Sequence, residues 1–162
     1  MTDISIPVSK PLNLLGFDRP AMQSYFSEIG EKSFRAQQLS KWIHQHGVVD
    51  FEKMTNLSLA LRSELEHKTV LDMPEVVFDQ TSRDGTRKWV LQLDDGNRIE
   101  TVFIPDDDRG TLCVSSQVGC ALDCTFCATG RQGFNRNLTS AEIISQLWLA
   151  ARFLEQEAIK TD

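Results

Sequence analysis

The sequence contains few cysteines, and they are not spread along the chain. Four cysteines occur in 162 residues, and all four lie between Cys113 and Cys127. So small and local a set excludes a scaffold built on disulfides. Clustered thiols in a reducing compartment are typical of metal, cluster or redox chemistry, because thiolates are soft ligands. The chemistry of this chain is therefore expected in that segment.

Long apolar runs and an excess of positive charge are also absent from the sequence. No apolar stretch approaches the about 18 residues that a membrane span needs, and residues 1–10 lack the basic-then-apolar order of a signal peptide. The 17 basic residues are outnumbered by 23 acidic ones, which excludes a uniformly basic nucleic-acid coat. The proportions, 41% hydrophobic and 25% charged, are those of an ordinary globular protein. We expect a cytoplasmic monomer without membrane contact.

Apolar residues at helical spacing predict a helical accessory domain over residues 18–74, after a flexible tail over residues 1–17. Asp18 is typical of a helix start and Gly30 of a helix end. A second helix is expected over residues 33–46, and a third follows it. The inner faces expected for the three helices are Met22, Phe26 and Ile29; Phe34, Leu39, Trp42 and Ile43; and Leu57, Leu61 and Leu65.

After Pro74 the apolar period changes from 3.6 to 2, which predicts a β extension with its linker over residues 75–110. The expected strands are residues 76–80, 86–93 and 98–104. Residues 94–97, Asp-Asp-Gly-Asn, are a strong signal for a hairpin turn between the last two. Residues 105–110 are acidic and rich in chain breakers, and they predict a linker.

Residues 111–162 predict a strand, a loop and a helix, which is the first half of a βαβ unit. The strand is expected over residues 111–118 and the loop over 119–137, and Thr139 and Glu142 form a capping box that opens the helix. The buried stripe expected on that helix is Ile143, Ile144, Leu147, Trp148, Ala151 and Leu154. The fold class is therefore α/β, with an α+β accessory region.

Three of the cysteines, Cys120, Cys124 and Cys127, have the spacing C-x3-C-x2-C. One short loop can thus contact three corners of a cubane cluster, and three protein ligands leave the fourth iron open to an exogenous ligand. Other interpretations remain at this point. Cys124 and Cys127 could form a thioredoxin-like pair, Cys113 could complete a structural zinc site, and an electron carrier would need a fourth ligand.

The run from Gly119 to Cys127 resembles the cluster loop of radical S-adenosylmethionine (SAM) enzymes. The wider run over residues 111–120, continued by residues 132–138, resembles one family of that class. Members of this family are dual-specificity methyltransferases that modify carbon 2 of an adenine in large-subunit ribosomal RNA and in transfer RNAs. The resemblance continues upstream through residues 98–105 and, more loosely, into residues 34–39.

The resemblance implies a 4Fe-4S cluster held by Cys120, Cys124 and Cys127, with S-adenosyl-L-methionine as the second cofactor. It implies 23S rRNA and tRNA as substrates, together with an electron donor for the cluster. In the family a methylated cysteine carries the methyl group, and Cys113 matches the thiol that attacks this cysteine and forms a disulfide. Glu100 matches the residue that accepts the carbon-bound proton of the adenine.

The length departs from the family pattern. A partial TIM-like barrel of this class needs several βα units of about 30 residues each, whereas residues 111–162 supply only the start of one. No cysteine follows Cys127, so the methyl-carrying cysteine has no counterpart here. We therefore expect the N-terminal portion of such an enzyme, with an incomplete core and no activity by itself.

Without the resemblance, Glu100 is an ordinary solvated or paired strand residue, and Cys113 is a buried strand cysteine. The alternative function is a zinc-stabilised RNA-binding module without catalysis. For RNA contact we hypothesise a local set of cations that face the phosphates, because counterion release needs clustered Lys and Arg. This set is Lys32, Arg35, Lys41, Arg131 and Arg136.

Overall fold

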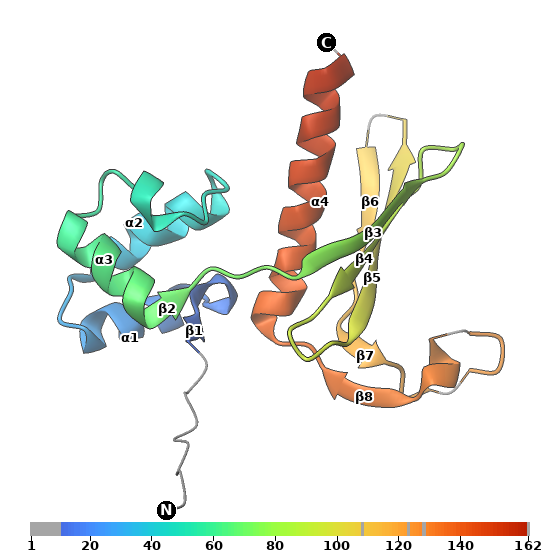
Figure 1. Cartoon of the computed structure of the whole chain (residues 1–162), viewed down its shortest axis with the longest axis horizontal. Coiled ribbons are helices and arrows are strands. Elements are labelled where there is room, and N and C mark those ends of the chain that lie inside the picture. Colours follow the sequence, from blue (N-terminus) through green and yellow to red (C-terminus); the bar gives the residue numbers. More distant parts are fainter. Residues whose placement is uncertain (1–10, 108, 123, 128, 162) are drawn as a thin grey trace, which may run out of the picture. The chain divides into compact units, whose positions relative to one another are not determined.

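The computed structural model describes residues 11–107, 109–122, 124–127 and 129–161, and it divides the chain into two compact units. The first unit is Met1–Asp72 and the second is Met73–Asp162. Figure 1 shows short helices in the first unit, and strands with one long helix in the second. Among the described residues, no helix combines the length and the apolarity that crossing a bilayer would require.

The first unit is helical, as predicted. Its elements are β1 (Leu12–Asn13), η1 (Leu14–Gly16), α1 (Arg19–Glu28), α2 (Ser33–His44), η2 (Phe51–Lys53), α3 (Leu59–Lys68) and β2 (Thr69–Val70). Asp18 caps α1 by accepting a hydrogen bond from the Ala21 amide at 2.8 Å. Gly30 follows α1 with φ +77°, a conformation that favours glycine. The sequence signals for the start and the end of α1 are therefore confirmed.

The core of this unit contains most of the expected helix residues, but Ile29 and Trp42 are only half-buried and Phe34 lies outside it. Phe34 was expected inside but is 47% exposed, and the guanidinium of Arg35 lies 4.9 Å from the centre of its ring. Leu14 and Leu15 are fully buried, so the predicted tail was wrong over this part. Residues 1–10 lie outside the described residues. The other buried apolar residues of the unit are Met22, Phe26, Ala36, Leu39, Ile43, Phe51, Met54, Leu57, Leu61, Leu65 and Leu71.

The second unit contains a four-stranded antiparallel sheet, a small two-stranded sheet and one long helix. The strands of the larger sheet are β3 (Glu75–Thr81), β4 (Arg87–Gln92), β5 (Arg98–Asp106) and β6 (Arg109–Cys113), in that spatial order. The rest of the unit is β7 (Gln117–Gly119), η3 (Gly130–Gln132), β8 (Phe134–Asn137) and α4 (Ser140–Thr161), and β7 pairs with β8 in antiparallel fashion. The three predicted strands of the extension are confirmed.

The expected linker over residues 105–110 is instead the tip of a hairpin. Pro105 lies opposite Gly110 and Asp106 opposite Arg109, so the pairing of β5 with β6 runs across the predicted boundary. The strand expected over residues 111–118 is two strands, β6 and β7, which belong to different sheets. Breaker residues are compatible with a hairpin end as well as with a linker, and the sequence signal does not distinguish these two cases.

The helix α4 packs on one face of the larger sheet, where the rings of Trp89 and Phe153 stack with centroids 6.0 Å apart. The stripe expected on this helix was only partly right. Leu147 is 54% exposed, whereas Ser145 and Gln146 are fully buried. Trp42 and Trp148, which were expected on buried helical stripes, are only half-buried, whereas Trp89 on β4 is buried. The remaining residues of this core are Leu91, Leu93, Ile99, Val118, Leu138 and Ala150, with Val76, Phe103, Leu112, Ile143 and Leu149 packed against them.

The different positions of Phe26 and Phe34 yield a matched pair of substitutions. Phe26→Ala removes a fully buried ring and should lower the free energy of unfolding of the helical unit by about 3–5 kcal/mol. Phe34→Ala removes an exposed ring and should cost less than about 1 kcal/mol. Urea unfolding followed by ¹⁹F NMR of fluorotryptophan measures this, since Trp42 is the only tryptophan in residues 11–72. Equal losses would contradict the position of Phe34.

Candidate cluster loop and sheet face

Two glycines close the base of the cysteine loop. Gly119, at the end of β7, and Gly133, just before β8, both have φ +70°. The Cys120 amide donates a hydrogen bond to the Gly133 carbonyl at 3.1 Å. A Cβ on Gly119 would lie 1.7 Å from that carbonyl oxygen, so only glycine fits there. Pairing of β7 with β8 thus holds the two ends of the loop together.

The three thiols of C-x3-C-x2-C are free and half-buried in this loop. The Cys127 amide donates to the Cys124 carbonyl at 3.0 Å, which forms a turn between the last two. Backbone amides of Gly130 and Thr129 donate to the Cys127 sulfur and lower the pKa of its thiol, because they stabilise the thiolate. Three soft donors on one closed loop, one of them with its thiolate favoured, fit an iron-sulfur cluster chemically.

The three cysteines predicted as metal ligands do not converge in this structure. Within the described part of the chain, no three His, Cys, Asp or Glu side chains gather into a group that could hold a metal ion. The apolar side chains of Leu122 and Phe126, which lie between the cysteines in sequence, are 79% and 89% exposed. The sequence therefore brings the three cysteines onto one loop, and the loop conformation leaves them apart.

Glu100 and Cys113 lie on the face of the larger sheet that α4 does not cover. Cys113 on β6 is paired with Val102 on β5, and Glu100 is two residues from Val102 along β5. Because alternate strand residues share a face, all three side chains point to the same side. Cys113 is exposed rather than buried, and the Glu100 carboxylate accepts a hydrogen bond from Lys88 Nζ at 3.2 Å. The register places the two residues as diagonal neighbours, and their roles stay predictions.

Gln146 on α4, which sequence reasoning missed, holds the connection between β6 and β7. Its Oε1 accepts hydrogen bonds from the Ser115 amide at 2.7 Å and from Thr101 Oγ1 at 2.9 Å. Its Nε2 donates to the Ser115 carbonyl at 2.8 Å and to the Glu142 carbonyl at 3.1 Å. The side-chain amide thus pairs with both backbone polar groups of Ser115, as a neighbouring strand would. Ser115 Oγ in turn donates to the Glu100 carbonyl at 2.8 Å, so this network positions the segment next to Cys113.

Arg136 on β8 pairs with carboxylates of the protein. This differs from the hypothesis that its charge faces the phosphates of RNA. Arg136 contacts Glu142 in α4 with two hydrogen bonds of 2.9 and 2.8 Å, and Asp95 in the β4–β5 turn at 2.7 Å. Hydrogen bonds from Arg136 hold the pKa of Glu142 and that of Asp95 below their usual range, and these partners raise the pKa of Arg136 itself. The network joins the base of the cysteine loop to the sheet and the helix.

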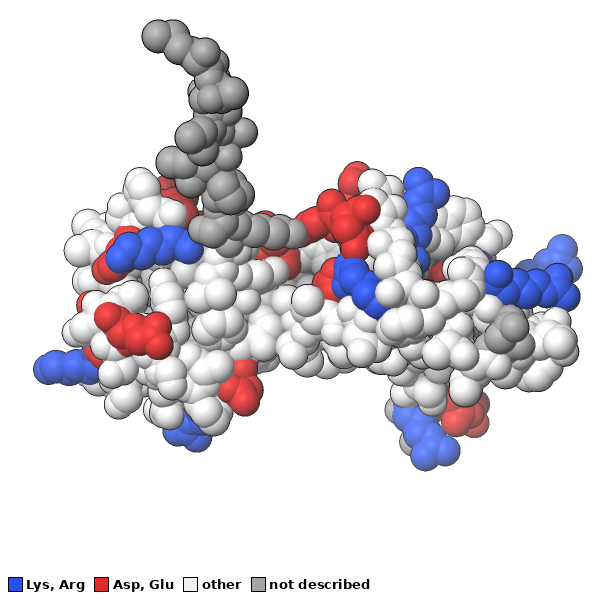
Figure 2. All heavy atoms as spheres, turned by 90° about the horizontal axis from the view of Figure 1, so that it is seen from below, with Lys and Arg blue, Asp and Glu red and all other residues white. Residues whose placement is uncertain are grey.

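The other cations of the RNA hypothesis are divided between the two units, with Lys32, Arg35 and Lys41 in the first and Arg131 in the second. Arg131 is exposed and donates to the Thr125 carbonyl at 3.1 Å within the loop. Arg35 Nη1 donates to Gln38 Oε1 at 2.9 Å and to the Asn56 carbonyl at 3.0 Å, so it links α2 to the segment before α3. Figure 2 shows basic and acidic side chains interspersed within each unit on the face it presents. Lys32 and Lys41 remain exposed on the helical unit.

Replacing Arg136 should change both the stability and its dependence on pH. The native pKa values of Glu142 and Asp95 are lowered. The two carboxylates therefore stabilise the folded state at pH values above about 4, the usual pKa of such a group in the unfolded chain. This stabilisation is lost as the pH falls through their native pKa values. Arg136→Met should lower the free energy of unfolding of the second unit at pH 7 by about 2 kcal/mol and flatten its decline in acid. Urea unfolding between pH 2 and pH 7, followed at Trp89, measures both effects.

The control for this prediction is Arg152→Met, which removes the same charge from an exposed arginine of α4. Arg152 has no ion pair among the described residues, so its replacement should leave the acid slope unchanged. The assignment of the slope to the Arg136 network is wrong if both variants lose stability in parallel at every pH.

Gln146→Leu keeps the approximate volume of the side chain and removes its hydrogen bonds. It should destabilise the second unit by about 2–3 kcal/mol, since the Ser115 amide and carbonyl and the Thr101 hydroxyl lose a buried partner. Amide hydrogen exchange at Ser115 should accelerate at least about tenfold more than exchange in β4. The control is Ser145→Ala, since Ser145 is equally buried but its hydroxyl donates only to the Ala141 carbonyl of its own helix. Uniform acceleration across the sheet would show that Gln146 has no local role.

The chain is similar to known proteins over nearly its whole length. The family model described as "Ribosomal RNA large subunit methyltransferase N-terminal domain" matches residues 12–71. The dual-specificity RNA methyltransferase RlmN of Marinobacter nauticus is 58% identical over 144 residues, which cover 89% of this chain and 39% of that protein. The protein of the same name from Pseudomonas putida (strain W619) is 57% identical over 151 residues, which cover 93% of this chain and 40% of that protein.

A solved structure is similar as well. A radical SAM methyltransferase from Sphaerobacter thermophilus matches with a TM-score of 0.82 and 36% identity, over 91% of this chain and 44% of that one. This likeness confirms the expected fold class, and the chain spans about two fifths of the curated relatives' length. Over most of its own length the chain is therefore similar to part of proteins named dual-specificity RNA methyltransferase.

Proposed function

We propose that this chain supplies the cluster loop, the proton acceptor and the resolving thiol of an enzyme that methylates carbon 2 of adenine in 23S rRNA and tRNA. The observation that carries the proposal is the closed loop with Cys120, Cys124 and Cys127, in a chain whose relatives are named dual-specificity RNA methyltransferases. The sheet face that bears Glu100 and Cys113 adds the two side chains that such a reaction needs.

The loop cysteines would hold three irons of a 4Fe-4S cluster and leave the fourth for S-adenosyl-L-methionine. When bound, this pair supplies the radical chemistry that allows an electron-poor ring carbon to be methylated. The chain's own contribution is to keep the loop closed through Gly119 and Gly133 and to favour the thiolate of Cys127 with backbone amides. Closure of the base shortens the distance over which the three thiols must come together on metal binding.

Glu100 and Cys113 would complete the reaction on the product side. The Glu100 carboxylate takes the carbon-bound proton of the ring, and Lys88 orients this carboxylate from the neighbouring strand. The Cys113 thiolate attacks the sulfur of the methylated cysteine that links enzyme and product. A sulfur-sulfur bond forms, the carbon-sulfur bond breaks with its electron pair going to the departing carbon, and this carbon takes up a proton from solvent to become the methyl group. The exposed position of Cys113 suits this attack because the thiol can reach a group that is bound above the sheet face.

The wider setting is part of the same proposal. An electron donor would reduce the cluster, and the enzyme would act as a cytoplasmic monomer, where the four free thiols stay reduced. The runner-up function, a zinc-stabilised RNA-binding module, uses the same cysteines. The relatives favour the methyltransferase, since both are named as enzymes of that kind.

A chimera tests the proposal. This chain replaces the matching part of the Marinobacter nauticus relative, and the product is reconstituted without oxygen. We expect about four irons and four sulfides per chain, together with 2-methyladenine in 23S rRNA, detected by mass spectrometry of digested RNA. Cys124→Ala should lose iron and activity together. Glu100→Gln and Cys113→Ala should keep the iron and lose methylation by at least about 100-fold.

Thr111→Val is the matched control, because Thr111 lies two residues before Cys113 on the same strand and face. It should keep both iron and methylation. One tightly bound zinc with no iron-sulfur absorbance would overturn the proposal in favour of the zinc-stabilised module. Full methylation by the Cys113→Ala or Glu100→Gln variant would remove that residue from the mechanism.

A further inference from the structure

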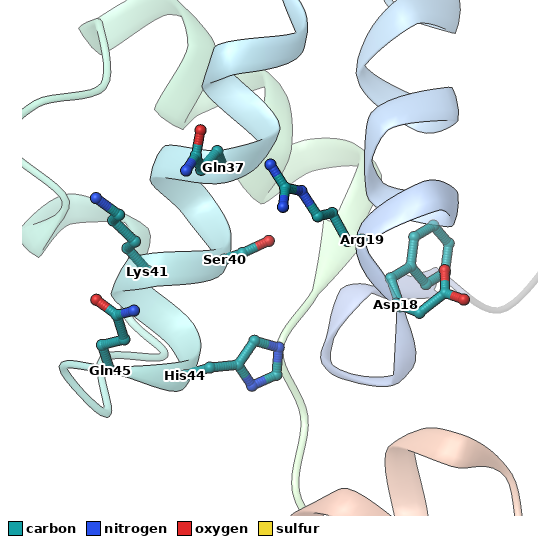
Figure 3. Close-up of a pocket in the computed structure, with 8 residues that line it drawn as sticks. Asp18, Arg19, Gln37, Ser40, Lys41, His44 and Gln45 are labelled. Atoms are coloured by element: carbon teal, nitrogen blue, oxygen red, sulfur yellow. The ribbon is translucent and has the colours of Figure 1, made fainter.

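The helical unit has a cavity of about 300 Å³ between α2 and the segment that leads into α1 (Figure 3). Figure 3 shows Gln37, Ser40, Lys41 and Gln45 along α2, with the Arg19 side chain reaching from the start of α1 toward Gln37 and Ser40. The complete lining is Phe17, Asp18, Arg19, Gln37, Ser40, Lys41, His44 and Gln45. The proposed methyltransferase chemistry uses none of these residues.

Two cations of this cavity have charges that the protein does not neutralise. Among the described residues, neither Arg19 nor Lys41 has an ion pair or a side-chain hydrogen bond. Other cations of the unit are engaged, since Lys53 pairs with Asp50, Lys68 with Glu64, and Arg62 donates to the Glu52 carbonyl. The carboxylate of the lining, Asp18, is occupied as the cap of α1. Counting the Asp18 carboxylate, the lining has a formal charge of +1, and its two cations are available to an anion in a chain whose net charge is −6.

The uncharged part of the lining suits a nucleobase. Gln37 and Gln45 carry amides, which can both donate and accept hydrogen bonds, and Ser40 adds a hydroxyl. Burial lowers the pKa of His44 and keeps its ring neutral at pH 7. Phe17 contributes an aromatic ring at one end, and bases of single-stranded RNA stack on such rings.

The size of the cavity limits what it can hold. A volume of about 300 Å³ lies at the lower end of ligand pockets and matches one nucleotide rather than a helical segment. We propose that this cavity binds a single nucleotide of unpaired RNA, with its phosphate between Arg19 and Lys41 and its base against the amides. The proposal rests on the RNA-directed function above and adds an unpaired nucleotide, bound by the helical unit, to what the enzyme recognises.

Direct binding measurements test the proposal without catalysis. The chain is titrated with a ten-nucleotide single-stranded RNA, with the same RNA as a duplex, with adenosine monophosphate and with inorganic phosphate. The double variant Arg19→Gln, Lys41→Gln should weaken single-strand binding at least about tenfold. It should also reduce the slope of log K against log salt by about 0.7, the contribution of one phosphate contact on a single strand. Amide shifts caused by adenosine monophosphate should map to α2 and the start of α1.

The matched control is Lys53→Gln, Lys68→Gln, which removes two charges from the same unit at lysines that are already paired. It should change single-strand affinity less than twofold, and the Trp42 ¹⁹F signal should show that both variants are folded. An equal loss in both variants would overturn the proposal, because net charge alone would then explain binding. Duplex bound as tightly as single strand, or free nucleotide or phosphate bound more tightly than RNA, would overturn it as well. Methylation by the chimera, measured separately, distinguishes a wrong cavity assignment from a wrong enzyme assignment.

Discussion

The second unit depends on one buried side-chain amide that takes the place of a missing strand partner. Where β6 ends, Ser115 loses its partner in the sheet, and a buried backbone amide and carbonyl without partners would cost free energy. Gln146 satisfies both groups from the inner face of α4. The chain can therefore leave one sheet at Cys113 and enter another at Gln117 while remaining packed on the helix. The positions of the outward-facing Cys113 and of the cysteine loop both follow from this switch.

The sequence predicted the parts of the fold in which local signals agree with the packing. Asp18, Gly30 and the leucines of α3 mark helices by local chemistry, and the hairpin turn after β4 joins the strands as its residues indicate. Errors occurred where the signal was ambiguous in itself. A run of Pro, Asp and Gly is compatible with a linker and with a hairpin tip, and an apolar stripe on α4 does not show that polar Gln146 faces inward. Leu14 and Leu15 are too few to show a period, although both are fully buried.

For the candidate site, the sequence identified residue types and spacing, and the structure added their surroundings. The spacing of three cysteines needs no tertiary information, and a resemblance pointed to Glu100 and Cys113. The register of β5 and β6 then showed these two residues on one open face. Arg136 was misread because its charge alone suggested RNA, whereas it pairs with Glu142 six residues later and with Asp95 from a distant part of the sequence. The contact between Arg136 and Asp95 joins residues more than 40 positions apart along the chain, so no local sequence pattern indicates it.

The close approach of Gly119 to Gly133 bears on how a metallocofactor would be inserted and removed. In small domains that fold only around their metal, chelation is accompanied by unfolding. Here strand pairing and a glycine contact already join the two ends, so the entropy of closing the loop is lost during folding of the protein itself. Assembly of the cofactor then needs to order only the short loop between these two glycines. A damaged inorganic core could be released and replaced while the sheet and the long helix keep their structure.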